Sequence, residues 1–112
     1  MSENVFVKSG RVTDLLPSTT TGNVTGDWRY KDAPKSAIQA TVVGTGAVAC
    51  TVTIQASNDA TYAVNTNVGV ITLSGTTSFS DGFTTDAPWK YLRAVVTGSS
   101  GTISSIQVLM SI

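Results

Sequence analysis

The sequence predicts an all-β fold: a single-domain antiparallel β-sandwich over residues 1–112, most simply a jelly roll of about eight strands. Three observations lead to this fold class. Apolar and polar residues alternate with a period of two, which is the pattern of half-buried strands. Ser and Thr supply 31 of the 112 residues, and no segment repeats its apolar residues at helical spacing. Turn residues recur about every ten positions, as between the short strands of a sandwich.

The first third of the chain holds the weakest strand signals. Residues 4–8 and 27–30 each form a short segment that we interpret as a strand. Residues 12–16 are compatible with a single helical turn that Pro17 would end. Residues 16–26 are rich in Thr and Gly and have little apolar surface to bury, so we expect a long loop or an extended arm there.

The clearest alternation runs through the middle of the chain. Residues 37–43 and 48–57 both alternate, and the segment 44–46 between them carries two glycines and has hairpin length. We therefore expect these two strands to pair with each other. Cys50 lies on the apolar side of its strand and has no second cysteine to bond with, so we expect a buried, unreactive thiol.

The rest of the chain supplies four more strands. Residues 68–73 and 77–83 form two shorter strands around a Ser-Gly-Thr turn. Residues 89–97 lead into a glycine-containing turn at 98–101, and a last strand with apolar residues at every second position of 106–110 closes a second hairpin. With the segments above, this makes about eight strands.

Side chains on which catalysis and metal binding depend are rare. The sequence has no histidine, one cysteine and a single glutamate, although acid–base chemistry and activated nucleophiles need such groups. The formal net charge is zero and the charges are scattered singly, so we expect neither a nucleic-acid surface nor a membrane patch. The sequence therefore predicts a protein that is not an enzyme and that has no catalytic residues and no cofactor.

The aspartates are explained by turns, where their side chains hydrogen-bond the local backbone. Most of them neighbour Gly, Asn, Ala or Pro, and none has the spacing of a calcium-binding loop, so we predict no metal site. The six positions are Asp14, Asp27, Asp32, Asp59, Asp81 and Asp86. An enzyme that uses Asp81 and Asp86 is the least supported alternative, because such a pair must be held in place with its pKa values split.

Aromatic and basic residues alternate in two segments, 27–31 and 86–93. Three interpretations fit this pattern: the tryptophans cap the core while the basic side chains reach outward, the residues anchor a protein interface, or the rings form a stacking surface for a carbohydrate. We select six of them as candidate protein-interface residues, together with the arm at 19–26. They are Trp28, Arg29, Tyr30, Trp89, Tyr91 and Arg93.

Two stretches resemble small all-β structural proteins of tailed bacteriophages. These are VTIQASND at 52–59, and DGF at 81–83 followed by APWKYLRAVVT at 87–97. Together with a length near 110 residues, they are similar to the jelly-roll decoration proteins, also called cement or staple proteins, of short-tailed phage capsids of the epsilon15 type. The resemblance covers residues 36–112.

The resemblance implies a structural virion protein. Such a protein binds the outer surface of the capsid, commonly as a homodimer, and staples neighbouring subunits of the major capsid protein against the pressure of packaged DNA. The N-terminal residues lack a secretory signal, so we expect synthesis in the host cytoplasm. The alternative is a carbohydrate- or receptor-binding β-sandwich module of a phage tail or fibre, which the tryptophans and tyrosines motivate.

Overall fold

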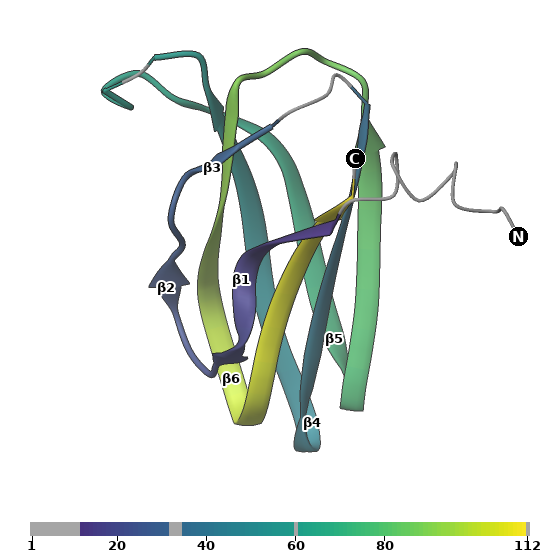
Figure 1. Ribbon diagram of the computed structural model, residues 1–112. Helices are drawn as coiled ribbons and strands as arrows, with labels where there is room; N and C mark the ends of the chain where they lie inside the picture. The colour runs from purple at the N-terminus through teal and green to yellow at the C-terminus, as the bar shows by residue number, and fades with distance from the viewer. Residues whose placement is uncertain (1–11, 32–34, 60, 112) are drawn as a thin grey trace, which may run out of the picture.

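Three strands of about twenty residues each make up most of the structure. The computed structural model describes residues 12–31, 35–59 and 61–111. Its strands are β1 (Val12–Thr20), β2 (Val24–Thr25), β3 (Arg29–Tyr30), β4 (Ser36–Ser57), β5 (Thr66–Thr85) and β6 (Tyr91–Ser111). All pairings are antiparallel, in the order β1-β6-β4-β5, and β2 and β3 also pair with β6 (Figure 1). The described residues contain no helix that is long and apolar enough to cross a membrane.

Each long strand bends near its middle and runs back, so that its two halves lie in different layers. The bends of β4, β5 and β6 gather at the lower end of the molecule in Figure 1. β4 and β6 pair in the same register on both sides of the bend: Ala37 lies opposite Ser111 in one half, and Ser57 lies opposite Tyr91 in the other. The register shifts of this pair are confined to the bend.

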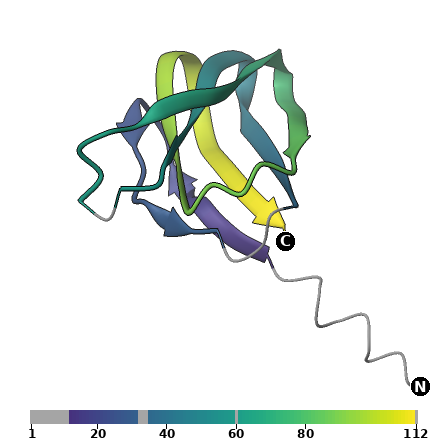
Figure 2. The same ribbon diagram turned by 90° about the horizontal axis from the view of Figure 1, so that it is seen from above.

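Divided at these bends, the six strands form two layers. One layer contains β1, the second half of β6, the first half of β4 and the second half of β5. The other contains β2 and β3, the first half of β6, the second half of β4 and the first half of β5. Seen from above, the layers enclose one interior (Figure 2). The predicted all-β, antiparallel sandwich is confirmed.

The predicted pairing of 37–43 with 48–57 is wrong. These segments are the two halves of β4, and each pairs with β5 on one side and β6 on the other. The two short strands predicted at 68–73 and 77–83 are likewise two halves of one strand, β5. The predicted hairpin of 89–97 with 106–110 is also wrong, because both segments belong to β6, which passes through both layers. Alternation and turn residues mark where a strand reverses, but they do not specify which strand lies beside it.

Glycines allow backbones to meet at the bend. Gly101 has a φ of +86°, and a Cβ on it would collide with the carbonyl oxygen of Ala47 in β4. A Cβ on Gly44 would collide in the same way with the carbonyl oxygen of Thr102 in β6. The bends of β4 and β6 therefore pack main chain against main chain, and this leaves no room for a side chain at either glycine.

The N-terminal expectations need correction. Residues 12–20 form β1, so 12–16 is not a helical turn and the predicted arm at 16–26 contains the end of β1 and all of β2. Leu15 and Leu16 are each only 2% exposed, because adjacent leucines in an irregular strand both turn inward. Pairing with β6 shifts register on both sides of Leu16, next to Pro17, which cannot donate a ladder hydrogen bond. The predicted strand at 4–8 lies outside the described residues.

The core lies between the layers and follows the alternation of the long strands. Burial falls on even-numbered residues of both halves of β4 and β6, so one face of each bent strand stays inside throughout. The largest fully buried side chains are Leu15, Ile38, Ile54, Leu73, Leu92, Ile106, Met110, Val42, Val48, Val52, Val96 and Val108. Cys50 is buried as predicted, and desolvation raises the pKa of its thiol, which keeps the thiol protonated and unreactive.

Candidate functional site: an aromatic and arginine cluster

Four of the six predicted interface residues come together at the end of the sandwich opposite the bends. Trp28, Tyr30, Tyr91 and Arg93 are joined by Tyr62, and we call these five residues the aromatic cluster. The ring of Trp28 stacks on that of Tyr62, with centroids 5.2 Å apart and an interplanar angle of 13°. The guanidinium carbon of Arg93 lies 4.5 Å from the centroid of the Trp28 ring, in a cation–π contact.

The tyrosines extend the cluster across β3 and β6. Tyr62 meets Tyr91 edge to face at a centroid distance of 5.1 Å, and Tyr30 lies 5.9 Å from Tyr91. Tyr30 and Tyr91 are also direct cross-strand partners in the β3–β6 ladder. Tyr30 is 56% exposed, so its ring is the part of the aromatic cluster that faces solvent most.

Hydrogen bonds across three strands orient the arginine. Arg93 Nε donates to Gln55 Oε1 at 2.8 Å, and Gln55 Nε2 donates to Asn67 Oδ1 at 3.1 Å. Gln55 on β4 lies directly opposite Arg93 on β6 and Asn67 on β5, so the register itself lines up this row. The row therefore holds the guanidinium of Arg93 in one position.

Tyr62 reaches the cluster from the loop 58–65, where it has a left-handed backbone with a φ of 60°. That conformation is unfavourable for a tyrosine and persists only where its surroundings impose it. Asp59 does so: its carboxylate accepts hydrogen bonds from the backbone nitrogens of Thr61 at 3.0 Å and Ala63 at 3.2 Å. Its carbonyl oxygen accepts one from the nitrogen of Tyr62 at 2.9 Å.

The base of the loop is tied to β4 by a buried hydroxyl. Ser57, the last residue of β4, is 1% exposed. Its Oγ donates to the carbonyl oxygen of Val64 at 2.6 Å and accepts from the backbone nitrogen of Asp59 at 3.0 Å. Both ends of the loop are therefore held by one side chain. The predicted turn chemistry of Asp59 is confirmed, whereas Tyr62 was missed because it lies in a loop outside the aromatic–basic segments.

Hydrogen bonds from Thr61, and further ones from Ala63 and Val64, lower the pKa of the Asp59 carboxyl below its ordinary value. The folded protein thus favours the charged carboxylate. The Asp59 carboxylate stabilises the fold fully at pH values above the pKa of this group in the unfolded chain, about 3.9. This contribution is lost as the pH falls through the lower pKa that the group has in the folded protein. We expect the aromatic cluster to loosen on acidification below about pH 4.

Replacing Asp59 with alanine is expected to release Tyr62 from the aromatic cluster at neutral pH. The loop loses the carboxylate that accepts from the backbone nitrogens of Thr61 and Ala63, on either side of the left-handed residue 62. The near-ultraviolet circular dichroism of the stacked Trp28–Tyr62 pair should fall, with a smaller change in melting temperature than a core substitution causes. Asp81→Ala is the matched control, because the Asp81 carboxylate accepts from its neighbour Gly82 at 2.8 Å. An unchanged aromatic spectrum in Asp59→Ala would show that the loop does not depend on this side chain.

The other two predicted residues lie elsewhere. Trp89 precedes β6 and is not on its outer face; its ring is partly buried and packs against the core. Arg29 is exposed, and its Nε donates to the carbonyl oxygen of Asp14 at 3.2 Å. Both tryptophans are therefore half-buried, but Trp89 packs against the core whereas Trp28 packs against Tyr62 and Arg93.

Lys31 does not reach outward as the core-capping interpretation assumed. It is 4% exposed, and its Nζ donates to the carbonyl oxygen of Ala87 at 2.8 Å. Burial lowers the pKa of its ammonium group, and the nearby charge of Asp86 opposes this shift. The side chain thus ties the chain just after β3 to the β5–β6 connection and is not available as a surface cation.

The predicted arm at 19–26 is attached to the sheet. The Asn23 side chain accepts from the backbone nitrogen of Ser99 at 3.0 Å, and the nitrogen of Gly26 donates to the carbonyl oxygen of Ala94 at 2.8 Å. The segment therefore lies along β6, and no free arm projects from residues 19–26.

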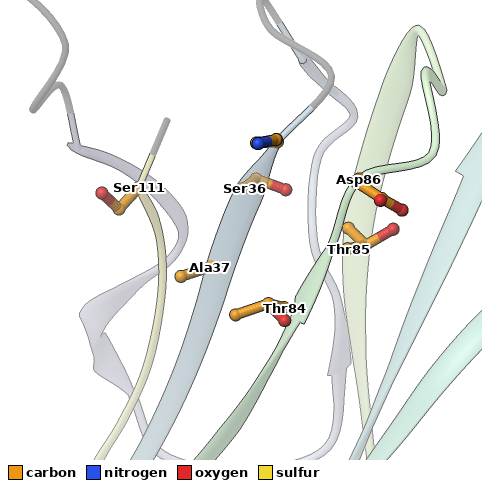
Figure 3. A pocket seen from close by; sticks show the side chains of 7 residues that line it. Ser36, Ala37, Thr84, Thr85, Asp86 and Ser111 are labelled. Atoms are coloured by element: carbon orange, nitrogen blue, oxygen red, sulfur yellow. The ribbon is translucent and has the colours of Figure 1, made fainter.

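Two pockets open near the same end of the sandwich. One, of about 500 Å³, lies between the loop 58–65 and Trp89 and is mostly apolar. The other, of about 490 Å³, lies where β4 begins and β5 ends, with Ser36, Thr84 and Asp86 around it (Figure 3). The lining of this second pocket holds hydroxyls, the side chain of Lys35 and the carboxylate of Asp86.

Within residues 12–31, 35–59 and 61–111, no three side chains of the metal-binding types come together. Comparisons of the chain with protein-family models, with curated proteins and with solved structures returned no match.

Proposed function

We propose that this protein is a structural virion protein that binds the outer surface of a phage capsid and staples neighbouring subunits of the major capsid protein. It works as a homodimer, by adhesion and without chemistry. The observation that carries the proposal is the aromatic cluster, which sets aromatic rings and an arginine on the surface of a rigid sandwich. The identity of the partner rests on the resemblance to capsid decoration proteins.

The composition of the cluster matches what dominates protein interfaces. Tryptophan, tyrosine and arginine are the residues most enriched among the few that supply most of the binding energy. Here the rings hold one another and Gln55 holds Arg93, so little side-chain freedom remains to be lost on binding. Two such surfaces in a dimer also bind jointly, and this can raise affinity far above that of a single contact.

A carbohydrate-binding module is the second candidate. The exposed ring of Tyr30 favours it, because sugars stack on open aromatic faces. The arrangement around Trp28 opposes it: Tyr62 stacks on the indole, and Arg93 also lies over it. The largest ring of the cluster is therefore already covered by protein. A glycan array with a saturable signal that Tyr30→Ala abolishes would favour this candidate over the first.

The proposal is tested by binding to capsids that lack the protein. Wild-type protein should bind at a saturable number of positions, visible on particles by electron microscopy and measurable by co-sedimentation. Trp28→Ala removes the ring against which Tyr62 and Arg93 are held, so it should weaken binding by about 30-fold or more, which corresponds to a loss of about 2 kcal/mol. Arg93→Lys should also weaken it, because lysine keeps the charge but loses the planar contact with the indole.

Thr45→Ala is the matched control, since Thr45 is exposed and lies among the register shifts that mark the bend of β4. It should bind like the wild type. Absence of saturable binding by folded wild-type protein would reject the capsid function. Equal binding by Trp28→Ala and Thr45→Ala would show that the aromatic cluster is not the contact.

A further inference from the structure

The free edge of β5 is the longest unpaired strand edge among the described residues. β5 contains 20 residues and pairs only with β4, and it borders both layers because its two halves lie in different ones. From Gly69 to Thr76 its pairing with β4 is uninterrupted. No strand of the described residues lies beside the backbone groups on the other side of this regular stretch, and such an edge is a template for pairing with another chain.

This edge lacks the features with which proteins usually prevent such pairing. Residues 66–80 contain no charged residue and no proline, and Val70 on the outer face is 60% exposed. The opposite side of the sandwich is protected: β1 contains Asp14, Pro17 and two register shifts, while β2 and β3 are only two residues long. Prolines, charges, bulges and short strands are the known means of blocking edge pairing. One edge of the sandwich is therefore blocked against strand pairing and the β5 edge is not, which indicates that the β5 edge pairs with another strand.

We propose that the occupant is a second copy of this chain, whose β5 pairs antiparallel with the first near Thr72 and joins two sandwiches edge to edge. A strand that pairs with its own copy must not bring like charges together, and the uncharged segment 66–80 meets that condition. Thr72 is the central outward-facing residue of the regular stretch, so the twofold axis places it against its own copy, with Val70 near Ser74. Threonine pairs are favourable in this cross-strand position.

This contact would form the dimer of the proposed function. The role of that dimer rests on the proposed function, in which a staple must reach two shell subunits. The contact leaves the aromatic cluster free, since the cluster is built on β3, β6 and the loop 58–65, whereas the dimer contact is on β5. Each dimer would then present two clusters to the shell. The surface is tested on purified protein without any capsid, so its failure and a failure of capsid binding are separate results.

The test places a charge on the proposed axis and measures self-association by sedimentation equilibrium. Wild-type protein is expected to be a dimer. Thr72→Lys puts two like charges opposite each other and should raise the dimer dissociation constant about tenfold or more. Thr72→Glu should do the same. An equal mixture of the two variants should recover the association, because the charges are then opposite. Val12→Lys adds the same charge to the exposed outer edge at β1 and should leave the dimer intact.

Amide hydrogen exchange supplies a measurement on the unaltered chain. Protection of β5 amides between Gly69 and Thr76 should rise with protein concentration, while protection within β1 should not. Circular dichroism checks that each variant is folded. A wild-type protein that stays monomeric overturns the proposal, as does a folded Thr72→Lys variant that dimerises like the wild type. Concentration-dependent protection confined to strands other than β5 would also place the contact elsewhere.

Discussion

Replacing Ile54 with alanine is expected to lower the free energy of unfolding by about 2–5 kcal/mol, toward the upper part of that range. Ile54 is fully buried in the second half of β4, and its direct cross-strand partners are Gly69 on β5 and Ala94 on β6. Because both partners are small, neither can fill the cavity. The partly buried ring of Phe83 lies against Gly69, and any movement of this ring into the space would reduce the loss.

The measurement is chemical denaturation followed by circular dichroism. Domains of this size are usually stable by about 5–15 kcal/mol, so the loss is a large share of the total. Thr53→Ala is the matched control on the outer side of the same strand and should change stability by no more than about 0.5 kcal/mol. A cost below about 1 kcal/mol for Ile54→Ala would mean that the interior collapses to fill the space.

Replacing Gly101 with alanine is expected to cost at least about 4 kcal/mol, because two penalties combine at this residue. Its φ of +86° is unfavourable for alanine, and the new Cβ would collide with the main chain of Ala47. Two other glycines of the same bend separate the two penalties. Gly46 has a φ of +72° with open space around it, whereas Gly44 has the close contact with Thr102 without a positive φ.

We expect Gly46→Ala to cost about 1–2 kcal/mol, the price of the backbone conformation alone. Gly44→Ala should cost more than Gly46→Ala, because the backbones of β4 and β6 must separate at the bend. Melting temperature and denaturant midpoint measure all three variants. If Gly101→Ala is no less stable than Gly46→Ala, the strands at the bend are not as closely packed as the structure shows.

The period-two pattern predicted where strands run and where they reverse, because alternation reports which side of a strand is buried. It did not predict the partners. The segments 37–43 and 48–57 bury the same face whether they pair with each other or fold over one interior, so the pattern is identical in the two arrangements. β1 was missed for a related reason: Leu15 and Leu16 are buried side by side, and adjacent buried residues break the alternation.

The candidate site was predictable where its residues lie in regular strands. Tyr91 and Arg93 share the outer face of β6, as their spacing indicated. Trp89 has the same two-residue spacing from Tyr91, but β6 begins only at Tyr91. Before Tyr91 the chain turns, and the nitrogen of Trp89 donates to the carbonyl oxygen of Ala87. The rule that every second residue of a strand lies on the same face therefore does not reach Trp89. Tyr62 depends on a loop conformation set by Asp59, which residue spacing alone does not encode.

The central position of β4 has a consequence for how the protein is made. β4 and β5 are joined by the loop 58–65 and can pair soon after both leave the ribosome, but the other side of β4 must wait for β6. The 54 residues from Ser57 to Ser111 take roughly 3–11 s to translate at about 5–20 residues per second. During that interval a nascent chain exposes an apolar, unfinished sheet, so crowded polysomes are expected to favour misassembly between neighbouring chains and slower translation to lower the yield.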